Sequence, residues 1–306
     1  MKMVFLKSKN RFGNQSLRDR LFLSLSFFSL SLGLLMLVLT VAFLLKETGF
    51  PFSRVFRFDL IFSPGWSPLA DPPDYRLGHA WISSFYITGI GLLISIPIGF
   101  GIGVFSAELA PPLIRKILQP ALELLAGIPA VVYGFFGYVT LVRLFEHFFA
   151  LSTGETVLAA GIILGVMMLP FIASTSAEAF RSSFAIYRES VLSLGVNQWT
   201  LLSKIVWVHA FPGLLAAVAL GFARGIGETL AVLMLSGNSV AVPQSILDRA
   251  QPVTALLATE LGETMVHSPK YQALFSAGFI LLIMVLIVNF GILLLKKKLF
   301  SRFFTS

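Results

Sequence analysis

The chain has 306 residues, of which 56% are hydrophobic and only 12% are charged, and its formal net charge is +8. Soluble domains carry about 25% charged residues, so this composition and a mean hydropathy of +0.86 exclude an ordinary soluble enzyme and indicate a chain solvated mostly by lipid. The absence of cysteine excludes disulfides, iron–sulfur clusters and thiolate zinc sites.

The N-terminal part combines a basic segment, residues 1–20, with a charge-free apolar run at 21–45. The run is longer than the roughly 7–15 residues of a secretory signal and does not end at a small-residue cleavage site. We therefore predict a cytoplasmic N-terminus followed by a signal-anchor transmembrane helix. The next segment, 46–79, is rich in proline and aromatic residues, has as many acidic as basic residues, and is predicted to be a periplasmic or extracellular loop.

The rest of the chain contains further apolar runs near the roughly 20 residues that span a bilayer. They are 80–107, 124–142, 156–177 and 273–295, with a fifth stretch at 205–247 that contains two charges. A single crossing of that fifth stretch places the lysine triplet after the last run in the cytoplasm, as the positive-inside rule requires. We predict an all-α, polytopic membrane protein with six transmembrane helices, a core at 80–296 that contains the second to sixth of them, and a cytoplasmic tail at 297–306.

The segment between the fourth and fifth runs, about 180–207, is polar but not loop-like. It contains "ESVLSLGVNQWTLLSKI", has no proline from 182 to 207, and has a single glycine, Gly195. This pattern predicts two short cytoplasmic helices that bend at Gly195, because glycine permits a sharp turn. Such a bend could present a helix to a soluble motor, or it could merely connect two spans.

Motifs of catalysis are absent from the sequence. It has no GxxxxGK[ST] phosphate loop, no HExxH and no GxSxG, and its four histidines are far apart. Because the histidines are scattered, no metal site is expected. The basic residues cluster at the chain ends rather than on one face, so no nucleic-acid partner is expected. We expect no cofactor.

Charged residues inside the apolar runs are the strongest functional candidates. Arg224 and Glu228 are four residues apart, which places them on one face if the segment is a single helix. They are either a structural ion pair or, since planar and always-charged arginine suits oxyanions, an anion site on a permeation path. Glu123 is a second candidate, with an interfacial carboxylate near Arg115 and Lys116 as its alternative.

Several stretches resemble a known family of ABC importer permeases. Glu189-Ser190-Val191, then Gly195, then Ile205 has the spacing of the EAA-type loop of these permeases. "ELLAGIPAVVYGFFG" at 123–137 and "ARGIGETLAVLMLSGN" at 223–238 resemble signatures of phosphate-specific (Pst) permeases. The second of these stretches, with "TALLATELGETMVHSPKYQAL" at 254–274, is similar to the PstC-type subunit rather than its PstA-type sister, and the resemblance covers roughly residues 80–295.

The resemblance implies the fold of a type I ABC importer (MetI-like) permease in a prokaryotic inner membrane, with both termini cytoplasmic. It implies no enzymatic activity of its own, and import of inorganic phosphate driven by a partner ATPase. Its partners would be a PstA-type permease, a PstB-type ATPase dimer and a PstS-type phosphate-binding protein. Glu189, Gly195 and Ile205 would couple to the ATPase, and Arg224, Glu228 and Glu123 would line the substrate path. A permease for sulfate, molybdate or tungstate, a membrane-embedded enzyme, and a channel without a motor are the alternatives.

Overall fold

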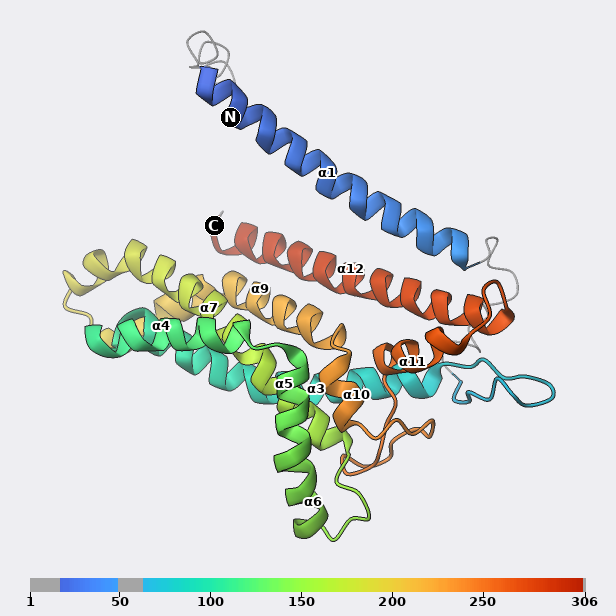
Figure 1. The fold of residues 1–306 in the computed structure, drawn as a ribbon. Coiled ribbons are helices and arrows are strands. Elements are labelled where there is room, and N and C mark those ends of the chain that lie inside the picture. Colours follow the sequence, from blue (N-terminus) through green and yellow to red (C-terminus); the bar gives the residue numbers. More distant parts are fainter. Residues whose placement is uncertain (1–16, 49–62, 305–306) are drawn as a thin grey trace. The chain divides into compact units, whose positions relative to one another are not determined.

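The computed structural model describes residues 17–48 and 63–304 (Figure 1). Within these ranges every regular element is a helix, and strand-like pairing is limited to two isolated bridges. The predicted all-α class is thus confirmed for the part of the chain that the structure describes. The first 16 residues of the predicted basic N-terminus and residues 49–62 of the predicted loop lie outside the described residues.

The first of two compact units, Met1–Pro51, contains the helix α1 (Leu17–Glu47). Its 31 residues correspond to about 46 Å of helix, which exceeds the roughly 30 Å of bilayer hydrocarbon. Leucine and phenylalanine occur on all sides of α1, the pattern of a helix surrounded by an apolar medium. The helix contains the whole of the predicted first span, 21–45.

The second unit is organised around the helices α3 (Gly78–Val104) and α7 (Val157–Leu192). Small residues let the two backbones approach closely. A Cβ atom built on Gly91 of α3 would lie 3.2 Å from the backbone nitrogen of Gly165 on α7. Farther along, Ser176 Oγ donates a hydrogen bond to the Gly99 carbonyl oxygen at 3.1 Å. This is how transmembrane helices associate when lipid provides no hydrophobic drive.

The third predicted span, 124–142, is sharply bent at Pro129. The structure has α4 (Pro112–Gly127) and then α5 (Ala130–Gly137), continued by the π-helix η2 (Tyr138–Val142) and by α6 (Arg143–Phe148). The two parts meet at an angle of 89°, visible in Figure 1. Pro129 explains the break, because proline lacks an N–H group and excludes helical geometry from the residue before it, Ile128. Ile128 accordingly has an extended backbone.

The predicted pair of short helices around Gly195 is wrong, although the bend itself is confirmed. The 36 residues of α7 continue to Leu192. After a turn, α8 (Gln198–Thr200), the π-helix η3 (Leu201–Val206) and α9 (Trp207–Ile226) form one apolar helical run. Gly195 has a φ of +77°, which favours glycine. We call residues 180–206 the α7–α9 hairpin.

Three short helices and one long helix complete the chain. They are α10 (Leu230–Leu235), α11 (Val253–Glu260), the 3-10 helix η4 (Leu261–Glu263) and α12 (Pro269–Phe304). The stretch 205–247 therefore contains the end of one long apolar helical run and only a short helix after it, which agrees with a single crossing. Five described helices are long and apolar enough to span a membrane, and a sixth is obtained if α4 and the α5–α6 run count as one span.

Candidate functional site

Arg224 and Glu228 form a direct ion pair. Arg224 Nη1 lies 2.7 Å from Glu228 Oε2. The Arg224 side chain is 39% exposed, whereas that of Glu228 is 6% exposed. The guanidinium also lies over the ring of Phe171, 5.9 Å from its centroid. Charged residues in an apolar membrane segment are costly, and they tend to face a bundle interior or a watery path.

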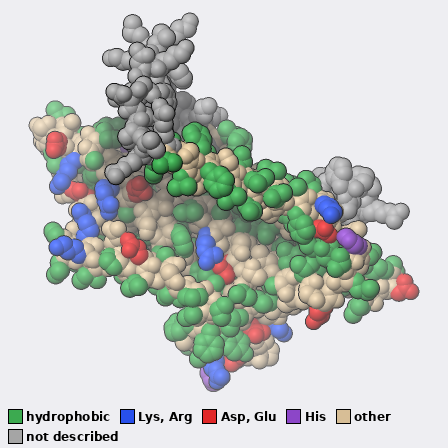
Figure 2. Space-filling view, turned by 45° about the horizontal axis from the view of Figure 1, so that its top comes forward, with side chains coloured by type: hydrophobic (Ala, Val, Ile, Leu, Met, Phe, Trp, Pro, Cys, Tyr) green, Lys and Arg blue, Asp and Glu red, His purple; other side chains and the backbone are tan. Residues whose placement is uncertain are grey.

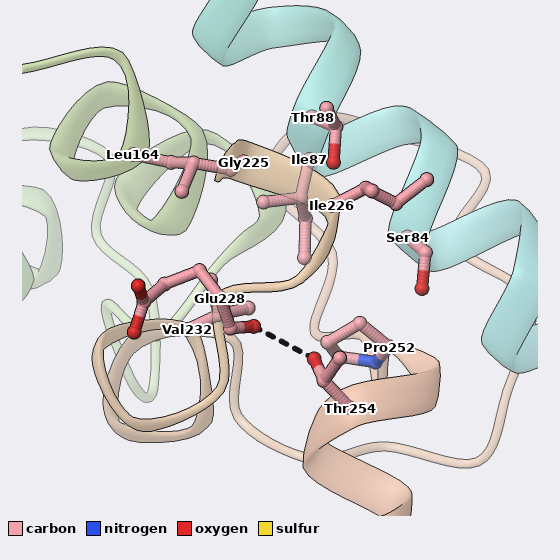
Figure 3. Close-up of a pocket in the computed structure, with 10 residues that line it drawn as sticks. All are labelled: Ser84, Ile87, Thr88, Leu164, Gly225, Ile226, Glu228, Val232, Pro252 and Thr254. Atoms are coloured by element: carbon pink, nitrogen blue, oxygen red, sulfur yellow. Dashed lines mark hydrogen bonds between the residues drawn. The ribbon is translucent and has the colours of Figure 1, made fainter. Parts of the chain in front are cut away.

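The pair has the predicted four-residue spacing, and a break in the helix just after Arg224 adds contacts that hold Glu228 in place. The helix α9 ends at Ile226, and α10 begins only at Leu230. In the intervening backbone, the Thr229 N–H donates to Glu228 Oε1 at 3.2 Å, and Thr254 Oγ1 donates to the Glu228 carbonyl oxygen at 2.7 Å (Figure 3). Discontinuous helices of this kind build ion and substrate sites in transporters.

A small cavity adjoins the Glu228 side of the break. Figure 3 shows hydroxyl groups of Ser84 and Thr88 on α3 near it, and Thr254 on α11. The remaining lining residues are Ile87, Leu164, Gly225, Ile226, Glu228, Val232 and Pro252. Its volume of about 10 Å³ holds roughly one water molecule. The space beside Glu228 is therefore small.

A larger cavity of about 500 Å³ lies along α9 on the other side of Arg224. It is lined by Thr175, Ala216, Ala219, Leu220, Ala223, Asn289 and Ile292, from α7, α9 and α12. Since the lining residues of α9 precede Arg224 here and follow it in the small cavity, the ion pair lies between the two along the chain.

Asn289 was missed by the sequence reasoning. It is the one polar residue in the apolar run 277–295 of α12, and it lines the large cavity. A polar group in the middle of a membrane helix needs a partner or a watery surface, and that is the signal that could have found it. Its Nδ2 donates to the Val285 carbonyl oxygen at 2.9 Å.

Glu123 makes no contact with the Arg224–Glu228 pair among the hydrogen bonds and ion pairs of the described residues. It is exposed on α4 and its Oε1 accepts a hydrogen bond from Gln119 Nε2 at 3.2 Å. Within the described ranges no hydrogen bond or ion pair joins it to Arg224 or Glu228. Arg115, its expected neighbour, instead donates from Nη2 to the Ala107 carbonyl oxygen at 3.1 Å. A role for Glu123 in the path stays a prediction.

The three residues predicted for coupling all lie on the α7–α9 hairpin. Glu189 is exposed in the last turn of α7, Gly195 forms the turn, and Ile205 packs on the hairpin's apolar cluster. The tip also exposes two large apolar side chains, Leu194 at 80% and Trp199 at 73%. In Figure 2, lysine and arginine side chains gather at the end of the molecule where α7 ends and α4 begins.

Comparison with known proteins identifies the family. Residues 99–303 match the family described as "Binding-protein-dependent transport system inner membrane component", and the chain belongs to it. It is therefore a multi-pass inner-membrane protein, and it is the membrane component of a transport system rather than an enzyme.

Individual relatives agree with this assignment. The chain is 38% identical to the "Probable ABC transporter permease protein YqgH" of Bacillus subtilis, over 83% of this chain and 81% of that protein. It is 33% identical to the "Phosphate transport system permease protein PstC" of Xylella fastidiosa strain 9a5c, over 70% of each chain.

A solved structure confirms the MetI-like fold. An inward-facing MetNI methionine ABC transporter chain superposes with a TM-score of 0.53 at 17% identity, covering 71% of this chain and 91% of that one.

Proposed function

We propose that this chain is the PstC-type permease subunit of an ATP-driven importer that carries inorganic phosphate into the cytoplasm. The Arg224–Glu228 pair carries the proposal: it lies at a helix break, Glu228 lines the small cavity, and Ala223, next to Arg224, lines the large one. The resemblance to proteins named as phosphate permeases supports the choice of substrate.

The chemistry of the pair suits a transient anion site. A guanidinium binds phosphate oxygens through a planar fork of donors and keeps its charge at every physiological pH. Glu228 competes with the anion for the same guanidinium, which keeps the affinity low enough for release. A carboxylate held by the surrounding backbone can do this repeatedly, because it stays in place when the anion takes its partner.

Orientation follows from the distribution of charge, with the α7–α9 hairpin in the cytoplasm. The helix ends near this hairpin carry Arg115, Lys116, Arg181, Arg188 and Lys204. At the opposite ends acidic residues outnumber basic ones: Asp71, Asp74, Glu146, Glu155, Asp248, Glu260 and Glu263 against Arg76, Arg143, Arg249 and Lys270. By the positive-inside rule, this distribution supports a cytoplasmic location for both termini, with the tail at 297–306.

The proposed partners follow from this orientation. A PstB-type ATPase dimer engages the exposed tip of the hairpin around Glu189 and Gly195, and a PstA-type permease completes the translocation path. A PstS-type protein delivers phosphate to the opposite side. ATP-driven closure of the motor moves the two permeases between outward- and inward-open states.

The test is uptake of labelled phosphate by the complete complex reconstituted in proteoliposomes. We expect Arg224→Ala to reduce uptake by at least about tenfold, the effect of losing one strong charged contact, with the complex still assembled. Arg143→Ala, an exposed arginine on α6, is the matched control and should transport normally. Normal uptake by Arg224→Ala would reduce the ion pair to a structural role.

The alternatives give distinct outcomes in the same assay. Uptake of labelled molybdate, tungstate or sulfate that excess unlabelled phosphate does not reduce would identify another oxyanion permease. Transport that persists without the ATPase would indicate a channel. The embedded-enzyme alternative is weakened by the family assignment.

A further inference from the structure

The α7–α9 hairpin is held to the end of α3 by an ion pair that the proposed function does not use. Beyond Val104, α3 continues as the π-helix η1 (Phe105–Leu109), which carries Glu108. Arg188 Nη2, on the last turns of α7, lies 2.9 Å from Glu108 Oε1. The two residues are far apart in sequence, so the contact joins two separate helices.

Glu108 is much more buried than Arg188, so its carboxylate depends on the arginine to balance its charge. The Glu108 side chain is only 11% exposed, whereas Arg188 is 54% exposed. A carboxylate removed from water requires compensating contacts, and losing its cation leaves an uncompensated charge. Arg188 is thus more than a mobile surface cation, because its partner is fixed inside the structure.

Further contacts make η1 a defined junction. The Ala110 N–H donates to the Phe105 carbonyl oxygen at 2.7 Å, the wide turn of a π-helix. Arg115 on α4 binds the Ala107 carbonyl in the same turn. Ala107 also packs in the apolar cluster of the hairpin, with Phe184 and Val191. Short π-helical turns inside longer helices often mark functional positions.

The helix α3, which η1 continues, also lines the small cavity next to Glu228, part of the proposed substrate region. Ser84 and Thr88 on α3 border the small cavity next to Glu228, while Arg224 lies in the last turn of α9, the helix that follows the hairpin. A displacement of the hairpin reaches α9 directly through the chain. It reaches α3 through the Glu108–Arg188 contact and the apolar cluster.

We propose that Glu108 and Arg188 are positioning residues that make α3 follow the α7–α9 hairpin, so that the motor moves both sides of the substrate region together. The inference rests on the proposed function for the identity of the motor. Arg188 precedes Glu189 directly, and on a helix the two side chains point about 100° apart. One residue therefore faces the fold while its neighbour stays exposed for a partner.

The first experiment is a double-mutant cycle in the reconstituted complex, measuring phosphate transported per ATP hydrolysed. We expect Glu108→Gln and Arg188→Gln each to lower this ratio about threefold or more, with ATPase activity retained. Because the residues act through each other, the double variant should be no worse than either single one. Arg188→Lys should restore part of the ratio, and Arg181→Gln, an exposed arginine on the same helix, should have no effect.

Two results would overturn the proposal. Unchanged ratios in the single variants would show that the contact transmits nothing. Fully multiplicative losses in the double variant would show that Arg188 acts through another partner, such as the ATPase itself.

A second measurement separates this inference from the choice of substrate. The chain has no cysteine, so spin labels at Leu109→Cys and Ile186→Cys, both exposed, report the η1–α7 distance in the complex. We expect one narrow distance that persists between the nucleotide-free and ATP-bound states, and a broadened one in Glu108→Gln. A complex that fails to transport phosphate but shows this difference would reject the substrate alone. An unchanged narrow distance in Glu108→Gln would reject the positioning role.

Discussion

The two ends of α7 show opposite ways of using a helix surface. Its first half packs against α3 through glycine and other small residues, with backbone atoms in near contact. Its last turns belong to the α7–α9 hairpin, whose tip exposes Leu194 and Trp199. One continuous helix thus connects a closely packed membrane pair to an apolar surface outside it.

This difference indicates what each region tolerates. In the packed pair, stability depends on the absence of side-chain atoms, so added volume is harmful wherever it meets backbone. At the hairpin tip there is space, and an added side chain meets little in the chain itself. Large exposed apolar residues there are typical of a surface that another protein covers.

The largest effect should come from added volume in the packed pair. A Cβ atom at Gly91 would lie 3.2 Å from the Gly165 nitrogen and 3.3 Å from the Gly161 carbonyl oxygen, and neither can rotate away. We expect Gly91→Val to lower the free energy of unfolding by about 3 kcal/mol or more and to abolish recovery of monodisperse protein in detergent. Gly89→Val on the same helix, where a Cβ atom meets nothing within 4 Å, is the control. Equal recovery of both variants would contradict the close packing of α3 and α7.

A smaller effect is expected at the turn of the hairpin. A Cβ atom at Gly195 also meets nothing within 4 Å, but its φ of +77° is unfavourable for other residues by roughly 1–2 kcal/mol. We expect Gly195→Val to yield folded protein that co-purifies with less ATPase, because the tip is reshaped. Gly195→Asn, which tolerates this backbone region, should co-purify nearly normally. A similar loss with both variants would point to side-chain volume instead of backbone conformation.

The smallest effect on the chain itself should follow Trp199→Ala. Its side chain is largely exposed, so the free energy of unfolding should change by no more than about 0.5 kcal/mol, as for an ordinary surface substitution. If the ATPase covers the tip, its affinity should fall about tenfold or more, as for an aromatic residue central to an interface. Binding measured with detergent-purified partners tests this. Unaltered affinity would place the ATPase contact elsewhere on the hairpin.

Much of the fold follows from local features of the sequence. Apolar run length predicts α1, α3, α7 and α12, because the thickness of the bilayer sets the length of a span. The bend at Gly195 was predictable from its position between helix-forming segments. The break at Pro129 also follows from local sequence, because a proline inside the predicted third span removes a backbone hydrogen bond and bends the helix. The continuation of α7 to Leu192 was missed because the polar segment after the fourth apolar run was interpreted as a separate short helix.

The candidate site was predictable in its residues but not in its construction. Arg224 and Glu228 are conspicuous because charges are rare in apolar runs. Their pairing depends on the end of α9 at Ile226 and on Thr254, which holds the Glu228 carbonyl from a helix 26 residues farther along the chain. The contribution of Asn289 to a cavity with α7 and α9 depends in the same way on packing between distant helices.

Composition and periodicity alone determined that this is a membrane protein, how often its helices can cross, and which charges lie at membrane depth, since the cost of placing each residue in lipid is a local property. Only the tertiary structure decided which charges meet, where helices break around them, and that Glu108 meets Arg188. Those outcomes depend on the relative placement of helices, which arises from close packing between residues distant in sequence.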